Sequence, residues 1–232
     1  MRAKVFIGVV ISLILEVVAR AAEPNPLTAA EQAAGWKFLF DGKSLEGWRG
    51  FRTDAPGAGW GVADGVLMTS GNAGDLMTKR VYGDFELSFE WKISEAGNSG
   101  VIYRIGLGEA AADRTGLEYQ ILDNLKAEDN ERPNHRAGSI YDLASAPSQD
   151  VTKPVGQWNL GRIVIRGWRV EHWLNGEKLI EFDLGSPAGR AAIAKSRFKD
   201  SPKFAAFPRG FIALQNDGHV VSFRSIKIRE LD

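Results

Sequence analysis

The sequence predicts an all-β fold: a sandwich of two antiparallel sheets with about a dozen strands in one domain. Three observations lead to this class. Segments with period-two alternation recur along the chain, glycine occurs 26 times and so permits many turns, and only two short segments have a helical pattern. With 232 residues, the chain is long enough for one domain with a well-buried core.

The first 21 residues have the pattern of a signal peptide. Arg2 and Lys4 give a basic start, residues 5–15 are apolar, and small alanines follow. An apolar stretch of about 11 residues is too short to cross a bilayer, which needs about 20. We therefore expect cleavage near Ala21 or Ala22, a periplasmic or secreted mature protein, and no membrane association after cleavage.

Residues 22–34 are expected to form a short helical lead-in to a β-sandwich domain that spans residues 35–232. Thr28 and Glu31 stand at the spacing of a capping box, and Gly35 is placed to end the helix. No linker, repeat or low-complexity tract divides the chain after this point.

Alternation then predicts the strands in order. In DFELSFEWKI, residues 84–93, five apolar side chains point one way and five polar ones the other, which is typical of a half-buried antiparallel strand. Further strands are predicted at residues 101–105, 117–122, 139–143, 161–166, 169–174, 178–182, 211–215 and 220–228.

Turn and cap residues refine this pattern. Asn175-Gly176 predicts a two-residue hairpin between its flanking strands. In the last strand the first and second apolar pairs are out of phase, so we expect a β-bulge near residues 224–225. Residues 186–198 predict the one later helix, with Ser186 as its N-cap.

Composition and motifs exclude several functions. The formal net charge is zero, which gives no reason to expect a nucleic-acid partner. Cysteine is absent, so no disulfide or lipid-attachment cysteine exists. The chain has no Walker loop, dinucleotide-type glycine motif or nucleophile elbow, and its three histidines lack metal-ligand spacing. The sequence therefore requires no cofactor, although its acidic loop leaves room for a divalent metal.

The polar face of GLEYQILDN, residues 116–124, is the first candidate site. Glu118 and Gln120 share one side of a strand about 7 Å apart, the width of one sugar ring. Glu118 and Asp123 do not form a glycosidase pair, because five residues span about 16 Å and end on opposite faces. The long polar loop that follows is where sites often lie, but a solvated loop without a site is the alternative.

Six segments of the chain resemble one known family. They are, in order, GWKFLFDGKSLEGWRG, GNSGVIYRI, GLEYQILDN, HRAGSIYDL, GQWNLGRIVIRGWRVEHWLNGEKLIEFDL and GFIALQNDGHVVSFRSIKIREL. Together they resemble the 3-keto-disaccharide hydrolase domain family from about Gly35 to Leu231. The resemblance implies a concanavalin A-like jelly roll and an exported bacterial enzyme that cleaves 3-keto-glycosides.

The resemblance also implies a chemistry. A ketone at C3 acidifies the C2 proton, so a base can remove it, the aglycone can leave C1, and water can add to the enone. On this basis Glu118 and His135 are candidate acid/base residues. The substrate-binding candidates are Arg104, Gln120, Tyr141, Asn98, Asp123, Asp142, Gln215 and Asp217. A non-catalytic, lectin-like glycan-binding module is the alternative.

The chain departs from the family at one motif. Family members commonly carry Gln-Asp-His-Gly where this chain has Gln215-Asn216-Asp217-Gly218. His219 would lie on the same face as Asp217 in an extended chain and is the candidate replacement for the family's histidine.

Overall fold

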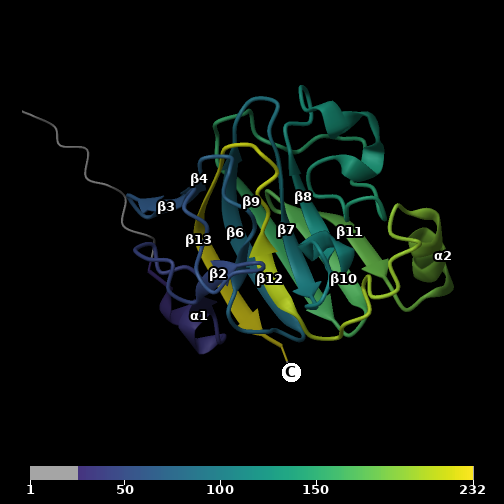
Figure 1. The fold of residues 1–232 in the computed structure, drawn as a ribbon, viewed down its shortest axis with the longest axis horizontal. Coiled ribbons are helices and arrows are strands. Elements are labelled where there is room, and N and C mark those ends of the chain that lie inside the picture. The colour runs from purple at the N-terminus through teal and green to yellow at the C-terminus, as the bar shows by residue number, and fades with distance from the viewer. Residues whose placement is uncertain (1–25, 232) are drawn as a thin grey trace, which may run out of the picture.

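A computed structural model describes residues 26–231 of the chain (Figure 1). The predicted signal peptide lies outside these residues. The helices and strands are α1 (Ala29–Ala33), β1 (Lys37–Phe38), β2 (Trp48–Gly50), β3 (Trp60–Ala63), β4 (Val66–Thr69), β5 (Leu76–Thr78), β6 (Phe85–Ile93), β7 (Asn98–Ile105), η1 (Ala112–Arg114), β8 (Leu117–Leu122), η2 (Glu128–Glu131), η3 (Pro133–His135), β9 (Asn159–Arg166), β10 (Arg169–Leu174), β11 (Glu177–Asp183), α2 (Pro187–Lys195), β12 (Phe211–Leu214) and β13 (Val221–Glu230).

The strands form two antiparallel sheets that pack face to face, which confirms the predicted fold class. The eight-stranded sheet has the order β11-β10-β9-β6-β13-β4-β3, with β1 also paired to β13. The five-stranded sheet has the order β2-β5-β12-β7-β8. Figure 1 shows the two helices at opposite sides of the sandwich, so neither covers a sheet. No helix within residues 26–231 is both long and apolar enough to span a membrane.

One apolar core lies between the sheets. The predicted alternation in β6 sends Phe85, Leu87 and Phe89 into it, all at most 1% exposed. From the other sheet, Tyr119 of β8 meets Phe89 edge to face, with ring centroids 5.3 Å apart. Such a geometry is favourable for aromatic pairs and fixes the two sheets against each other.

The predicted turn and bulge are confirmed. Asn175 and Gly176 have φ of 51° and 92° and join β10 to β11, as a type I′ turn requires. The register of β13 against β6 shifts between Arg224 and Lys227, and Ser225 within the shift has φ of 52°. The bulge returns the later apolar residues of β13 to the core side.

Both predicted helix starts are also confirmed. The Thr28 hydroxyl accepts from the Glu31 N–H at 3.1 Å, and the Glu31 carboxylate accepts from the Thr28 N–H at 2.8 Å. At α2 the Ser186 hydroxyl accepts from the Gly189 N–H at 3.0 Å. The later helix ends at Lys195, three residues before the predicted end.

The predicted strand over residues 139–143 is wrong. Ile140 forms only isolated bridges, and Asp142 has φ of 57°, which breaks an extended run. The segment still lies along the free edge of β8, because the Tyr141 N–H donates to the Glu118 carbonyl at 3.0 Å. This edge contact carries Tyr141 next to the polar face of β8.

Candidate active site

β8 presents its side chains alternately to the two faces of the five-stranded sheet. Leu117, Tyr119 and Ile121 belong to the core between the sheets. Glu118 and Gln120 therefore lie on the outer face, as the alternation predicts. They are only 6% and 0% exposed, so these two polar side chains are buried and do not belong to a solvated surface.

A glycine on β7 gives the Glu118 carboxyl its position. Gly100 pairs with Gln120, and its carbonyl accepts from the Gln215 N–H at 2.8 Å. A Cβ built on Gly100 would lie 2.2 Å from Oε1 of Glu118. The Glu118 side chain therefore lies across Gly100 and points toward β12, in space that no other residue type at position 100 would leave free.

Four carboxyl groups gather on this face. Burial raises the pKa of Glu118 well above its usual value. The nearby carboxylates of Asp113, Asp75 and Asp217 raise that pKa further, and only the Arg197 guanidinium lowers it. Burial also raises the pKa of Asp75 to about 6, although the hydrogen bond that its carboxylate accepts from a backbone N–H lowers this pKa. Carboxyl groups with raised pKa in a buried site suit proton transfer.

Three amide atoms beside the carboxyls have no hydrogen bond within residues 26–231. Oε1 of Gln120, Oε1 of Gln215 and Nδ2 of Asn216 are buried without a hydrogen bond among the described residues. The Gln120 Nε2 donates to Asn98 Oδ1 at 3.3 Å, which places Asn98 in the same cluster. Buried amides without partners are costly, and a ligand with several hydroxyl groups would satisfy them.

His135 lies in a second cluster next to this face. Its Nδ1 contacts Asp129 at 2.6 Å, its Nε2 contacts Asp142 at 3.2 Å, and its ring stacks on Tyr141 with centroids 4.3 Å apart. The imidazole is 4% exposed. Both nitrogens contact carboxylates, which hold the ring beside Tyr141, and the acid/base role of His135 stays a prediction.

Arg197 connects the two clusters. Its backbone N–H donates to Asp142 at 2.6 Å and its guanidinium donates to the Tyr141 hydroxyl at 3.4 Å. The same guanidinium is the cation that acts on Glu118. A cavity of about 410 Å³ lined by Asp129, His135, Tyr141 and Arg197, among others, opens beside it.

Two of the predicted substrate-binding residues, Arg104 and Asp123, lie outside the carboxyl cluster. Arg104 has φ of 56°, which turns its side chain away from the outer face, and its guanidinium donates to Asp84 at 3.3 Å and contacts the ring of Trp168. Asp123 follows the end of β8, and its carboxylate accepts from the Ala96 N–H at 2.8 Å. Both side chains form hydrogen bonds with other parts of the protein.

The segment that departs from the family motif lies at the rim of the carboxyl cluster. Asp217 is exposed, and its charge acts on both Glu118 and Asp75. His219 is half-buried, and its Nδ1 has no partner among residues 26–231. Within that part of the chain, no group of three or more His, Cys, Asp or Glu side chains could hold a metal ion.

Sequence reasoning missed Asp75, Asp113 and Arg197. They come from the residue before β5, from η1, and from the turn after α2, so no spacing along the chain connects them. Only the pairing of β5 with β12 and of β7 with β8 brings the first two toward Glu118.

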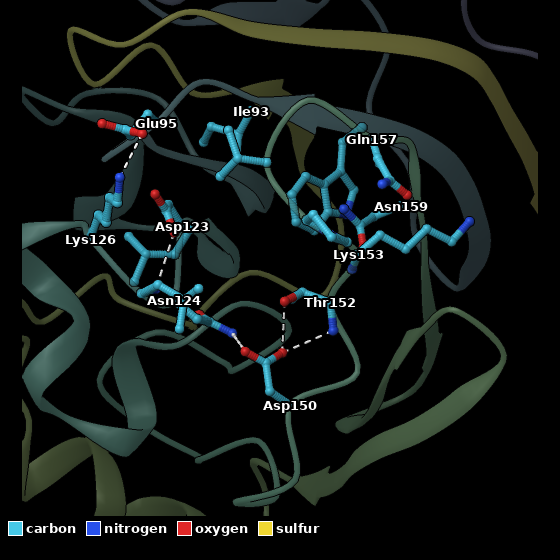
Figure 2. A pocket seen from close by; sticks show the side chains of 15 residues that line it. Ile93, Glu95, Asp123, Asn124, Lys126, Asp150, Thr152, Lys153, Gln157 and Asn159 are labelled. Carbon is cyan, nitrogen blue, oxygen red and sulfur yellow. Dashed lines mark hydrogen bonds and ion pairs between the residues drawn. The ribbon is translucent and has the colours of Figure 1, made fainter.

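A larger cavity of about 470 Å³ lies at one end of the sandwich (Figure 2). Two of the carboxylates that line it bind neighbouring residues of the surrounding loops. Asp150 accepts from Asn124 at 3.1 Å and from the Thr152 N–H at 2.8 Å, and Glu95 pairs with Lys126 at 2.7 Å. We therefore place the candidate active site on the outer face of the five-stranded sheet.

Asp75→Asn is expected to stabilise the protein in a pH-dependent way. The Asp75 carboxyl has a pKa of about 6 in the folded protein and an ordinary value of 3.8. Between these two pH values the folded state binds a proton that the unfolded state has lost, so the free energy of unfolding falls as pH rises through that window. Asparagine keeps an acceptor for the Asn216 N–H and removes the buried charge. The free energy of unfolding should rise by up to about 3 kcal/mol at pH 8, and by less at pH 4.5.

Urea unfolding at the two pH values measures this effect. Asp200→Asn, which removes an exposed carboxylate, is the control and should change little at either pH. An equal gain for Asp75→Asn at both values would show that the Asp75 carboxyl is not desolvated.

Comparisons with known proteins identify the family of the chain. The model of the 3-keto-alpha-glucoside-1,2-lyase-like domain matches residues 35–229. A curated 3-keto-disaccharide hydrolase of Bacteroides thetaiotaomicron is 31% identical over 246 aligned positions, which cover 92% of this chain and 84% of that protein.

Two solved structures from Parabacteroides distasonis, both provisionally named as glycosyl hydrolases, have the same fold. One has a TM-score of 0.84 at 32% identity and covers 90% of this chain and 100% of its own. The other has a TM-score of 0.68 at 29% identity and covers 84% and 99%. The predicted class of glycoside-cleaving hydrolase is confirmed by these matches. The chain belongs to the family of 3-keto-α-glucoside-1,2-lyase-like domains.

Proposed function

We propose that this protein cleaves 3-keto-glycosides by elimination across C1 and C2 followed by hydration, with Glu118 as the base. The observation that carries the proposal is the buried Glu118 carboxyl with its raised pKa, beside the Gln120 amide oxygen, which has no hydrogen bond within residues 26–231. The curated relative named as a 3-keto-disaccharide hydrolase supports the substrate class. A carboxyl that is a stronger base than usual suits removal of a carbon-bound proton next to a ketone.

The proposed reaction has an elimination step and a hydration step. Glu118 takes the C2 proton, and the electron pair forms an enolate on the C3 oxygen. The C1–O bond then breaks, the ketone is restored, and the aglycone oxygen receives the proton that Glu118 holds. Water adds to C1 of the enone while a proton returns to C2, so that the net reaction is hydrolysis. Arg197 is the cation placed to stabilise the enolate, and Gln120, Asn98 and Gln215 hold the sugar hydroxyls.

We also propose that the enzyme acts outside the cytoplasm. The basic start, the apolar residues 5–15 and the alanines at 21 and 22 support export. Mass measurement of the secreted or periplasmic protein tests this, because cleavage near Ala21 or Ala22 fixes the expected mass of the mature chain.

A substrate panel tests the reaction. Purified protein is incubated with 3-keto-glucosides of both anomers and with the matched unoxidised glucosides, and products are identified by mass spectrometry. We expect release of the aglycone from the 3-keto compounds only. Binding of glycans without any product would favour the lectin-like alternative, and cleavage of unoxidised glucosides would exclude the elimination.

The pH dependence of the rate follows from the raised pKa of Glu118. The base must be ionised to take a proton, so kcat/KM should rise with pH along a limb that lies well above the ordinary carboxyl value of 4.5. Initial rates between pH 4 and pH 9 measure this limb. A plateau that is already complete at pH 5 would show that Glu118 is not the titrating base.

A further inference from the structure

One end of the outer face carries positive charge, in contrast to its acidic centre. The register places Glu118 opposite Ile102, Ile102 opposite Ala213, Ala213 opposite Met77, and Met77 opposite Arg49. Paired residues of an antiparallel sheet point to the same side, so Arg49 on β2 shares the outer face with Glu118 on β8. Four strand spacings, about 19 Å, separate their backbones.

A cavity of about 480 Å³ lies at this end of the row. Arg49, Phe51 and Arg52 form one wall, and the segment 107–110, which includes the half-exposed Leu107, forms the other. The Phe51 N–H donates to the Asp75 carbonyl at 3.1 Å, so this wall adjoins the carboxyl cluster. One wall of the cavity is therefore hydrogen-bonded through its backbone to Asp75, a member of the carboxyl cluster.

Within residues 26–231, neither the Arg49 nor the Arg52 guanidinium group forms an ion pair with a carboxylate. Among the cavity residues in the described part of the chain, only Glu109 is acidic, and it pairs with Lys203 at 2.9 Å. Arg49 instead lies over the Phe211 ring, 5.2 Å from its centroid. Free guanidinium groups bind carboxylates in a forked geometry, and the Phe51 ring and Leu107 offer apolar surface next to them.

We infer that this cavity is the subsite for the leaving group, and that it selects an aromatic aglycone bearing a carboxylate. This inference rests on the proposed function, which puts the keto sugar at Glu118. The carboxylates of Asp75, Asp113 and Glu118 repel an anion from the centre of the face, whereas Arg49 and Arg52 attract it at the end. Charge thus orients the substrate, with the neutral sugar at the centre and the anionic ring against Phe51.

Matched substrates test the inference. The 3-keto-glucosides of 4-hydroxybenzoic acid and of 4-hydroxybenzamide have nearly the same shape and differ by one charge. In the parent enzyme kcat/KM for the acid should exceed that for the amide by roughly 10- to 100-fold, because hydrogen bonds to charged groups are the stronger ones. Added salt should reduce this ratio.

The double variant Arg49→Gln/Arg52→Gln should bring the ratio to about one through a loss on the acid alone. The double variant Lys43→Gln/Arg166→Gln removes two exposed positive charges elsewhere and is the matched control. Equal rates for acid and amide in the parent enzyme, or an unchanged ratio in the first variant, would overturn the inference while leaving the proposed function intact.

Binding of the free aglycones tests the subsite without catalysis. In an NMR titration, 4-hydroxybenzoate should bind the parent protein more tightly than 4-hydroxybenzamide, and the Arg49→Gln/Arg52→Gln variant should lose this difference. If no 3-keto-glycoside is cleaved, the proposed function fails and this titration alone decides the subsite. The same affinity for both compounds would overturn it.

Discussion

Glu118→Gln is expected to lower kcat by roughly 10²- to 10⁴-fold, the usual contribution of one general acid or base. Glutamine keeps the shape and the hydrogen-bonding reach of the side chain but cannot accept the C2 proton. Steady-state kinetics on a 3-keto-glycoside that the parent cleaves measures the loss. Substrate binding should survive, because the neighbouring amides of Gln120 and Gln215 remain in place.

Two controls make this result specific to the chemistry. Glu177→Gln changes an exposed glutamate at the start of β11 and should leave kcat unchanged. Urea unfolding of Glu118→Gln should show no loss of stability at neutral pH, since the change removes a group whose charge is unfavourable when buried. A folded variant with near-parent turnover would mean that another group removes the proton.

Gly100→Ala is expected to lower kcat by roughly 10²-fold, the loss that a misplacement of about 1 Å can cause. The new methyl group would overlap the Glu118 carboxyl, and the three nearest atoms to it all belong to that side chain. The Gly100 backbone does not require glycine, because its φ is not in the left-handed region. The sheet should therefore fold as before while the carboxyl moves away from β12.

A control and a double variant distinguish displacement of the Glu118 carboxyl from a loss of kcat caused by disruption of the sheet. Gly61→Ala on β3 adds the same methyl group where no atom lies within 4 Å, and it should leave kcat unchanged. If Gly100→Ala acts only through Glu118, the double variant with Glu118→Gln should be no slower than Glu118→Gln alone. Normal turnover in Gly100→Ala would contradict the placement of the Glu118 carboxyl over that glycine.

The sequence by itself determined the fold class, most of the strands from residue 84 onward and the faces of those strands, but it missed the short strands β1 to β5. Alternation is a local property, so it was enough to place Glu118 and Gln120 on one side of β8 and Tyr119 on the other. Asn175-Gly176 and Ser186 were likewise readable, because a turn or a cap depends on a few adjacent residues. The family could be recognised for the same reason: its motifs are contiguous segments.

Only the tertiary structure decided which of these residues form a site. The left-handed backbone of Arg104 turns its side chain toward Asp84, and a hydrogen bond from the distant Ala96 N–H engages the Asp123 carboxylate. Asp75 and Arg197 joined the site through strand pairing and a turn. Burial, which raises the pKa of Glu118, depends on the packing of the whole chain over one face. These effects act through space between residues far apart in sequence, so no local pattern records them.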